Sequence, residues 1–365
     1  MRFLKKVHRL GHATAESRMK RIALMFHTLF CDLSLRMVFR AEMTAWRPDV
    51  VHAHDGIALP LASKVADDCG ARLVFDSHEL ETHRNPPLSR IRRWQVQHLE
   101  RKYLPKADAV FTVGQKIAGF LSSAYKIKQP VVLYNSPRVS PRPMSQRWDT
   151  PDRSNLREEL LIRRNGFLLV HTGNVTFNRG IEQAVIGLSK AVSNPAFKDA
   201  YPGGVHLALV GKRVPQVVAR IEQLHQRYGA CIQLHFVEPV AANRVVDYIS
   251  TADASISAGV PLVLSYEFGM PNKLFEALMA GLPLIASDLV EMKRFIAENR
   301  LGVSYQADDT DKLAEAFTEL AFNMERYRIP ADRLDTLRQR FCWEAQEAKL
   351  LNTYSELLGQ EVAHG

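Results

Sequence analysis

Short apolar runs alternate with longer, helically periodic segments along most of this chain. In the first half, four runs rich in β-branched residues and bounded by Pro, Gly or Asp predict strands at 49–54, 71–77, 108–113 and 130–135. Segments with helical periodicity lie near 58–69, 90–104 and 114–124. Strands that alternate with helices in this way predict a parallel sheet covered by helices on both faces.

The same alternation returns after a segment without periodicity. Residues 136–154 contain four prolines and several serines, a composition that predicts a linker. Further strands are expected at 166–172, 205–211, 231–237, 253–258, 283–287 and 302–305. Further helices are expected near 179–193, 214–228, 241–251, 272–280, 289–299, 310–325, 331–340 and 343–358. The pattern predicts two doubly wound α/β domains joined by a hinge, with ligands in the cleft at the carboxyl ends of the strands.

Composition agrees with two ordinary globular domains, since the 365 residues are 46% hydrophobic and 24% charged. Residues 1–45 predict helices and basic residues where such a domain normally opens with an apolar strand and a glycine loop. The apolar window 22–39 contains His27, Asp32 and Arg36, so we expect no membrane-spanning helix. No signal-peptide pattern is present. The four cysteines are far apart without metal-ligand spacing, which favours free thiols and a cytoplasmic location.

Positive charge is concentrated in the first half. Residues 1–150 hold 25 lysines and arginines against 13 aspartates and glutamates, a net +12, which leaves −3 of the total +9 for the remainder. An anionic membrane surface is therefore a candidate partner of the first domain. Nucleic acid is not expected, because no nucleic-acid-binding motif is present. The alternative is that these cations only solvate helix faces.

Two strand-to-helix turns in the second half carry residues suited to phosphate. The strand ending in Thr172 is followed by Gly173 and Asn174, and Arg179 and Gly180 then open a helix. Free amides and the helix dipole at such a turn attract an anion, which an arginine can pair. The next strand ends in Gly211 and Lys212, a cation placed to meet a diphosphate. An ordinary turn with solvated cations is the alternative at both places.

A third turn lies in 266-YEFGMPNKLFEALMAGLPLIASD-288. Pro271 suits a helix start, and Gly269 lets the backbone approach a ligand. The free amides within 271–274, where Pro271 itself has no N–H, and the Lys273 ammonium are then expected to face a diphosphate. Glu276, one turn later, is placed to accept hydrogen bonds from ribose hydroxyls, or else only to interact with the helix dipole.

Histidines and carboxylates end two strands of the first domain. One strand ends in His52, His54 and Asp55, and the next in Asp76 and His78, followed by Glu79 and Glu81. Two such ends facing one cleft predict an acid/base or hydroxyl-binding wall. His52 and His54 point the same way from their strand, and one of them is expected to be a core histidine. A metal site is an open alternative, but the histidines lack the helical zinc-motif spacing that would support it.

From residue 47 to 360 the chain resembles the family 4 retaining glycosyltransferases of the GT-B fold, the group 1 type that assembles bacterial polysaccharides and glycolipids. The similar segments occur in the family's order: DVVHAHD, LVFDSHELE, ADAVFTVGQKIAGFL, HTGNVTFNRGIE, PNKLFEALMAGLPLIASD and FCWEAQEAKLLNTYSELL. The resemblance implies two Rossmann-like domains facing a cleft. The acceptor-side domain would comprise 1–150 plus the C-terminal helix 345–365, and the donor domain 151–344.

The resemblance also implies residue roles. Catalysis would involve His78 against the transferred sugar and Arg179 and Lys273 at the diphosphate, while Glu276 would bind ribose and the 236–239 turn the nucleobase. The implied donor-binding set is Gly173, Asn174, Arg179, Gly211, Lys212, Val237, Glu238, Gly269, Met270, Pro271, Asn272, Lys273 and Glu276. The implied acceptor-side set is His54, Asp55 and Glu79. No metal and no cofactor beyond the nucleotide-sugar donor is implied.

Three departures from the family pattern keep alternatives open. The first glutamate of its E-x7-E motif falls on Phe268, a phosphate cation is replaced by Asn174, and the opening strand and glycine loop are not evident. A non-catalytic GT-B protein that acts as a binding partner is one alternative. A UDP-sugar 2-epimerase is another, although its GTRPE-like loop is not found here. The favoured expectation is sugar transfer with retention of configuration to a saccharide or lipid-linked acceptor, in the cytoplasm or peripherally at the inner membrane face.

Overall fold

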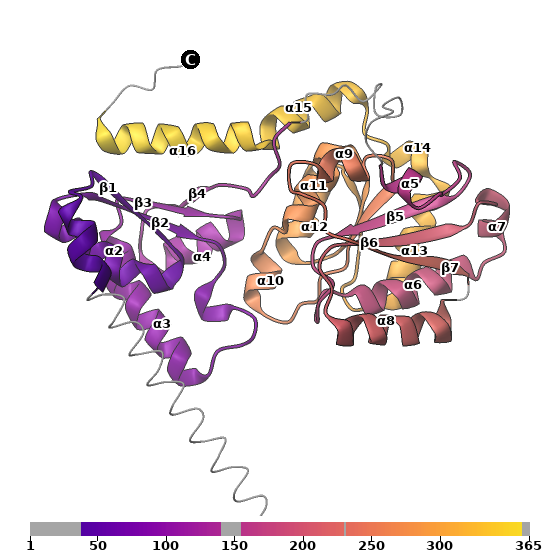
Figure 1. Ribbon diagram of the computed structural model, residues 1–365, viewed down its shortest axis with the longest axis horizontal. Helices are drawn as coiled ribbons and strands as arrows, with labels where there is room; N and C mark the ends of the chain where they lie inside the picture. The colour runs from indigo at the N-terminus through magenta and orange to yellow at the C-terminus, as the bar shows by residue number, and fades with distance from the viewer. Residues whose placement is uncertain (1–37, 140–154, 230, 360–365) are drawn as a thin grey trace, which may run out of the picture.

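Ten strands form two all-parallel sheets in the computed structural model, which describes residues 38–139, 155–229 and 231–359 (Figure 1). The first sheet has the order β1-β2-β3-β4, built from Val50–His54, Arg72–Ser77, Ala109–Thr112 and Val131–Val132. The second has the order β10-β9-β8-β5-β6-β7. Its strands are Phe167–Thr172 (β5), Val205–Val210 (β6), Ile232–Val237 (β7), Ala254–Ser257 (β8), Leu284–Ser287 (β9) and Gly302–Tyr305 (β10).

The first sheet is covered from two sides by helices of different origin. Its connecting helices are α2 (Asp55–Cys69), α3 (Arg90–Tyr103) and α4 (Gln115–Tyr125), with short turns η1 (Glu81–His83) and η2 (Leu104–Lys106). Helix α16 (Trp343–Leu358), the last element of the described chain, lies along the opposite side (Figure 1). The Tyr354 hydroxyl lies 2.6 Å from His52 Nδ1, and Lys349 donates to the Val132 carbonyl at 3.4 Å. The C-terminal helix therefore returns to the first sheet.

The strand order of the second sheet reverses between β5 and β8, which is the doubly wound arrangement whose ligands bind where the order changes. Its longer helices are α6 (Ile181–Val192), α8 (Pro215–Tyr228), α11 (Asn272–Ala280), α12 (Val290–Glu298), α13 (Thr310–Phe322) and α15 (Ala331–Phe341). Its short helices are α5 (Leu156–Glu159), α7 (Ala196–Ala200), α9 (Val245–Ile249), α10 (Leu264–Phe268) and α14 (Met324–Tyr327).

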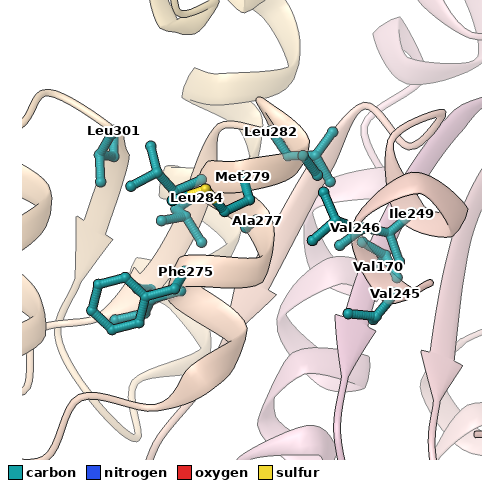
Figure 2. Close-up of a cluster of buried hydrophobic side chains, with 14 of the residues drawn as sticks. Val170, Val245, Val246, Ile249, Phe275, Ala277, Met279, Leu282, Leu284 and Leu301 are labelled. Carbon is teal, nitrogen blue, oxygen red and sulfur yellow. The ribbon is translucent and has the colours of Figure 1, made fainter. Parts of the chain in front are cut away.

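Buried side chains on α11 fix its orientation. Phe275, Ala277 and Met279 are at most 1% exposed and belong to a core cluster that also takes in β5, α9 and β9. Figure 2 shows labelled members of this cluster around the helix. Leu274, Leu278 and Ala280 are buried as well, so α11 is packed on almost every side. Lys273 and Glu276 are three residues apart on the helix, and both contact the carboxyl end of β5.

The two sheets confirm the expected GT-B architecture, and each of the ten expected strands is present. β4 is shorter than expected, because only Val131 and Val132 pair with β3. Four short helices were not expected: α5, α7, α10 and α14. The expectations for the missing first strand, for window 22–39 and for the linker fall mainly on residues 1–37 and 140–154, outside the described residues. Among the described residues, no helix has the length and apolarity needed to cross a membrane. Cys69, Cys231 and Cys342 are free, and Cys31 lies outside the described residues.

Candidate active site

The candidate site begins where β5 ends, next to the change in strand order. All six residues of β5 are buried, and its last two, His171 and Thr172, are polar. Buried polar side chains need partners, and both find theirs on α11. Sequence reasoning did not select these two residues. Their signal was a polar pair at the end of an otherwise apolar strand.

The loops after β5 and β6 pack against each other. The Val175 amide donates to the Lys212 carbonyl at 2.8 Å, and the Gly211 amide donates to Val237 at 3.1 Å. Gly211 has φ +155°, and a Cβ there would lie 2.2 Å from the Gly173 carbonyl oxygen, so no other residue fits. The structure thus brings together the two predicted glycine turns and the end of β7. Lys212 and Asn174 are exposed at this edge.

The start of α6 sits tightly beside β8. Gly180 caps this helix with φ +69°, and a Cβ there would lie 1.5 Å from the Ala258 carbonyl oxygen. Arg179 is exposed, with its guanidinium 5.7 Å from the centre of the Tyr266 ring. The unpaired first-turn amides of α6 and a guanidinium therefore face the same edge of the sheet.

Lys273 extends from the first turn of α11 over the end of β5. Its Nζ lies 3.1 Å from His171 Nε2, and its Cε is 4.0 Å from the Cβ position of Gly173. Burial and the nearby Arg179 charge lower the pKa of Lys273 to about 7, while Glu276 acts in the opposite direction. Burial, followed by Lys273, holds the pKa of His171 well below its ordinary value, so this imidazole is neutral and accepts from the ammonium.

Glu276 accepts a hydrogen bond from the Thr172 hydroxyl. Burial raises the pKa of Glu276, and the bond from Thr172 and the charge of Lys273 oppose that rise. One helix turn thus places a cation and a carboxylate side by side over the end of β5.

The charges and hydrogen-bonding groups of these residues are suited to an anion with a polar group attached. Arg179 and Lys273 are close enough to perturb one another electrostatically, and like charges at short range are unfavourable unless an anion lies between them. The N-termini of α6 and α11 add free amides and positive dipole ends. Glu276 lies one turn further along and supplies a hydrogen-bond acceptor.

The turn after β7, which we expected to contact the nucleobase, and the glycine before α11 have structural partners of their own. Glu238 pairs with Arg213, a residue that sequence reasoning did not select. Gly269 has an ordinary extended backbone with φ −77°, and a Cβ there would lie 2.7 Å from the Ser265 carbonyl oxygen. Its small size is therefore required by α10, whereas we had expected it to serve a ligand. Met270 is buried in the core, so only its backbone can face the site.

Phe268, which stands where the family's glutamate is expected, packs against the core of the first sheet. Its carbonyl oxygen would lie 2.9 Å from a Cβ placed on Gly114, the residue before α4. The aromatic side chain thus has an interdomain packing role that a carboxylate could not take without burying charge.

The histidines and carboxylates at the ends of β1 and β2 lie together in a compact cluster. His54 Nδ1 lies 3.4 Å from Asp76 Oδ2 and 3.5 Å from His78 Nε2. His78 Nε2 lies 3.2 Å from Asp76 Oδ2, and His78 Nδ1 lies 3.4 Å from Asp55. Glu79 is separate from this cluster, 3.6 Å from Arg84, and burial raises its pKa.

Several polar contacts join the two domains. The Leu80 amide donates to the Ser265 hydroxyl at 3.2 Å, and Asn85 donates to the Tyr266 hydroxyl at 3.0 Å. Because Tyr266 also lies under Arg179, one side chain connects the first domain to the predicted diphosphate cation. Sequence reasoning missed Tyr266, whose role depends on the unexpected helix α10.

Comparison with known proteins agrees with this architecture. Residues 166–323 match the family model described as "Glycosyl transferases group 1", and residues 6–137 match the "Glycosyl transferase 4-like domain". Glycogen synthase of Mycobacterium tuberculosis is 24% identical over 280 residues, which cover 74% of this chain. The aligned part spans 60% of the length of that relative. Phosphatidyl-myo-inositol mannosyltransferase of Mycobacterium leprae is 30% identical over 166 residues, 43% of this chain and 41% of that protein.

A solved structure of HepE from Anabaena in complex with UDP superposes with a TM-score of 0.67 at 17% identity, covering 88% of this chain and 82% of that chain. This likeness shows the fold. The two family matches make the chain a member of the group 1 glycosyltransferases, and its fold is GT-B.

Proposed function

We propose that this protein transfers a sugar from a nucleotide-diphospho-sugar to a saccharide or lipid-linked acceptor. The observation that carries the proposal is the meeting of Lys273 and Glu276 on α11 with His171 and Thr172 at the end of β5. It supplies a cation for a diphosphate and a carboxylate for vicinal hydroxyls at the ligand-binding edge of a doubly wound sheet.

In this proposal the donor lies along the second domain. The diphosphate binds between the N-termini of α6 and α11, paired by Arg179 and Lys273. The ribose binds at Glu276, and the base lies toward Val237 and Glu238 at the end of β7. HepE from Anabaena has been solved in complex with UDP and with UDP-glucose, so UDP-sugars are the first donors to test.

The proposed reaction retains configuration and needs no metal at the diphosphate. The bond between the sugar's anomeric carbon and the β-phosphate oxygen breaks, and the acceptor hydroxyl forms its bond on the same face. The acceptor proton passes to the departing phosphate oxygen. Arg179, Lys273 and the helix amides stabilise the charge that develops on this leaving group. His78 orients the sugar from the first domain.

We propose further that the first domain docks on anionic membranes through α3. Ile91 and Trp94 are 68% and 63% exposed on this helix, and His98 stacks on Trp94 along the same face. Exposed cations flank this stripe at Arg90, Arg92, Arg101 and Lys102. An exposed isoleucine and tryptophan flanked by cations suit the surface of an anionic bilayer. The apolar side chains would enter the interface, and the cations would contact the anionic headgroups. A lipid-linked acceptor fits this location.

Release of nucleoside diphosphate from UDP-, GDP- and ADP-sugars, with and without a bacterial glycolipid extract, tests the activity. We expect release that depends on the acceptor and falls when Arg179→Ala removes a leaving-group cation. A protein that binds a nucleotide sugar but never releases the diphosphate is the non-catalytic alternative. Interconversion of free UDP-sugars without transfer would instead identify an epimerase.

A further inference from the structure

The histidine cluster of the first domain has the atoms of a metal site. His52 and His54 come from β1, and Asp76 and His78 from the end of β2, and the cluster holds three imidazoles but a single shared carboxylate oxygen. One ligand atom each from His52, His54 and Asp76 lies within 4.8 Å of the other two. Three imidazoles and one carboxylate form a donor set that suits zinc and other divalent first-row transition metals.

The spacing of three of these atoms fits tetrahedral coordination. His54 Nδ1, His78 Nε2 and Asp76 Oδ2 form a triangle with sides of 3.2, 3.4 and 3.5 Å. Ligands about 2.0–2.1 Å from a tetrahedral Zn²⁺ are separated by about 3.3 Å from each other. The triangle is therefore one face of such a tetrahedron, already at the required size.

His52 is the fourth candidate ligand. Its Nε2 is buried and has no hydrogen-bond partner among the described residues, although a buried polar nitrogen normally has one. Its ring stacks on His54 with centroids 4.4 Å apart.

Two of the histidines also have the outer partners that metal-binding imidazoles use. The second nitrogen of His52 lies 2.6 Å from the Tyr354 hydroxyl, and that of His78 lies 3.4 Å from Asp55. Such oxygen acceptors fix which nitrogen carries the proton and leave the other free for the metal. Tyr354 belongs to α16, so the C-terminal helix completes the site.

We propose that His52, His54, His78 and Asp76 bind one divalent transition-metal ion of the Zn²⁺ class. The site lies on the first-domain wall, apart from the cations that would hold a diphosphate, and it does not depend on the proposed sugar transfer. Because His78 is also expected to touch the transferred sugar, a bound ion and the sugar would compete for that side chain.

Calorimetric titration of the untagged, chelator-treated full chain with Zn²⁺ tests the proposal. We expect one ion per chain, binding about 10–100-fold weaker in Tyr354→Phe, which loses an outer partner. His54→Ala and Asp76→Ala should weaken binding further, because each removes a ligand. His98→Ala changes a histidine on α3, outside the cluster, and should bind like the wild type.

Co²⁺ provides a readout that needs no variant, since a tetrahedral site gives intense visible absorption and an octahedral one gives weak absorption. Circular dichroism of each variant separates loss of binding from loss of folding. The proposal is overturned if the wild type binds no stoichiometric Zn²⁺, if the Co²⁺ spectrum is weak, or if folded His54→Ala and Asp76→Ala bind as the wild type does.

Discussion

Lys273 Nζ lies 3.1 Å from His171 Nε2, at the carboxyl end of the central strand β5. The imidazole is neutral, and Arg179 adds like charge, so the ammonium is held where its charged form is disfavoured. An anionic ligand between Lys273 and Arg179 would reverse this penalty. The charge of Lys273, and with it the affinity of the site for an anionic ligand, therefore depends on pH.

The first prediction is that donor affinity falls as pH rises above about 7. In the free protein the pKa of Lys273 is about 7, and a bound diphosphate would raise it. The donor thus prefers the protonated form, so affinity is constant below pH 7 and declines by up to about tenfold per pH unit above it. Calorimetric titration of a nucleotide sugar from pH 6 to about 9 measures this. Lys273→Arg, which stays charged, should flatten the profile, and an equally steep decline in that variant would contradict the assignment.

The second prediction concerns Glu291, a fully buried carboxylate on α12 that accepts from the Gln115 amide of α4 at 3.1 Å and pairs with Arg294 at 2.7 Å. Glu291→Ala should destabilise the protein by about 1–3 kcal/mol and accelerate hydrogen exchange at Gln115, because α4 loses its acceptor from the other domain. Glu298→Ala removes the exposed partner of the same arginine and should cost under about 1 kcal/mol. Equal losses in urea unfolding would contradict the interdomain role.

The third prediction concerns Gly180. A methyl group there would overlap the Ala258 carbonyl, and φ +69° is unfavourable for alanine. Gly180→Ala should therefore destabilise the second domain by at least about 1–3 kcal/mol in urea unfolding and weaken donor binding. Gly119→Ala is the matched control, since nothing lies within 4 Å of its Cβ position inside α4. That control should be neutral or stabilising by up to about 1 kcal/mol.

The fourth prediction tests the membrane surface. The full chain should sediment with vesicles containing phosphatidylglycerol more strongly than with phosphatidylcholine alone, and less strongly as salt increases. Replacing Ile91 and Trp94 with serine should weaken binding tenfold or more, because each buried apolar side chain contributes about 1.5–3 kcal/mol. Leu161→Ser removes an 89% exposed leucine from the second domain and should have no effect. Loss of binding in the control alone would place the contact elsewhere.

Hydrophobic patterning was sufficient to predict the strands. β5, β6, β8 and β9 are buried along their whole length, and each of the others has at least one buried residue. The unexpected helices are only four or five residues long, too short for a helical period to be visible. α10 is the important one, since it carries Tyr266 and Phe268 into the domain interface. Its formation depends on packing against the first sheet, which local sequence does not reveal.

For the candidate site, sequence reasoning selected Arg179, Lys273 and Glu276, and the structure brings all three to one edge of β5. It missed their protein partners His171, Thr172 and Tyr266, because those contacts join segments about 90–100 residues apart. Sequence reasoning also selected the first-domain histidines. It could not predict how close together they lie, because that depends on the register of β1 with β2. Which residues bind the donor stays a prediction.

Donor binding at α11 is tested most directly by thermal unfolding of the wild type, Glu276→Ala and the control Glu298→Ala with UDP-, GDP- and ADP-sugars. One donor at 100 times its dissociation constant should stabilise the wild type and the control by about 2.7 kcal/mol. Glu276→Ala loses hydrogen bonds to a charged acceptor worth about 1.5–3 kcal/mol, so most of this stabilisation should vanish. Equal stabilisation of all three proteins, or of none by any donor, would contradict the account.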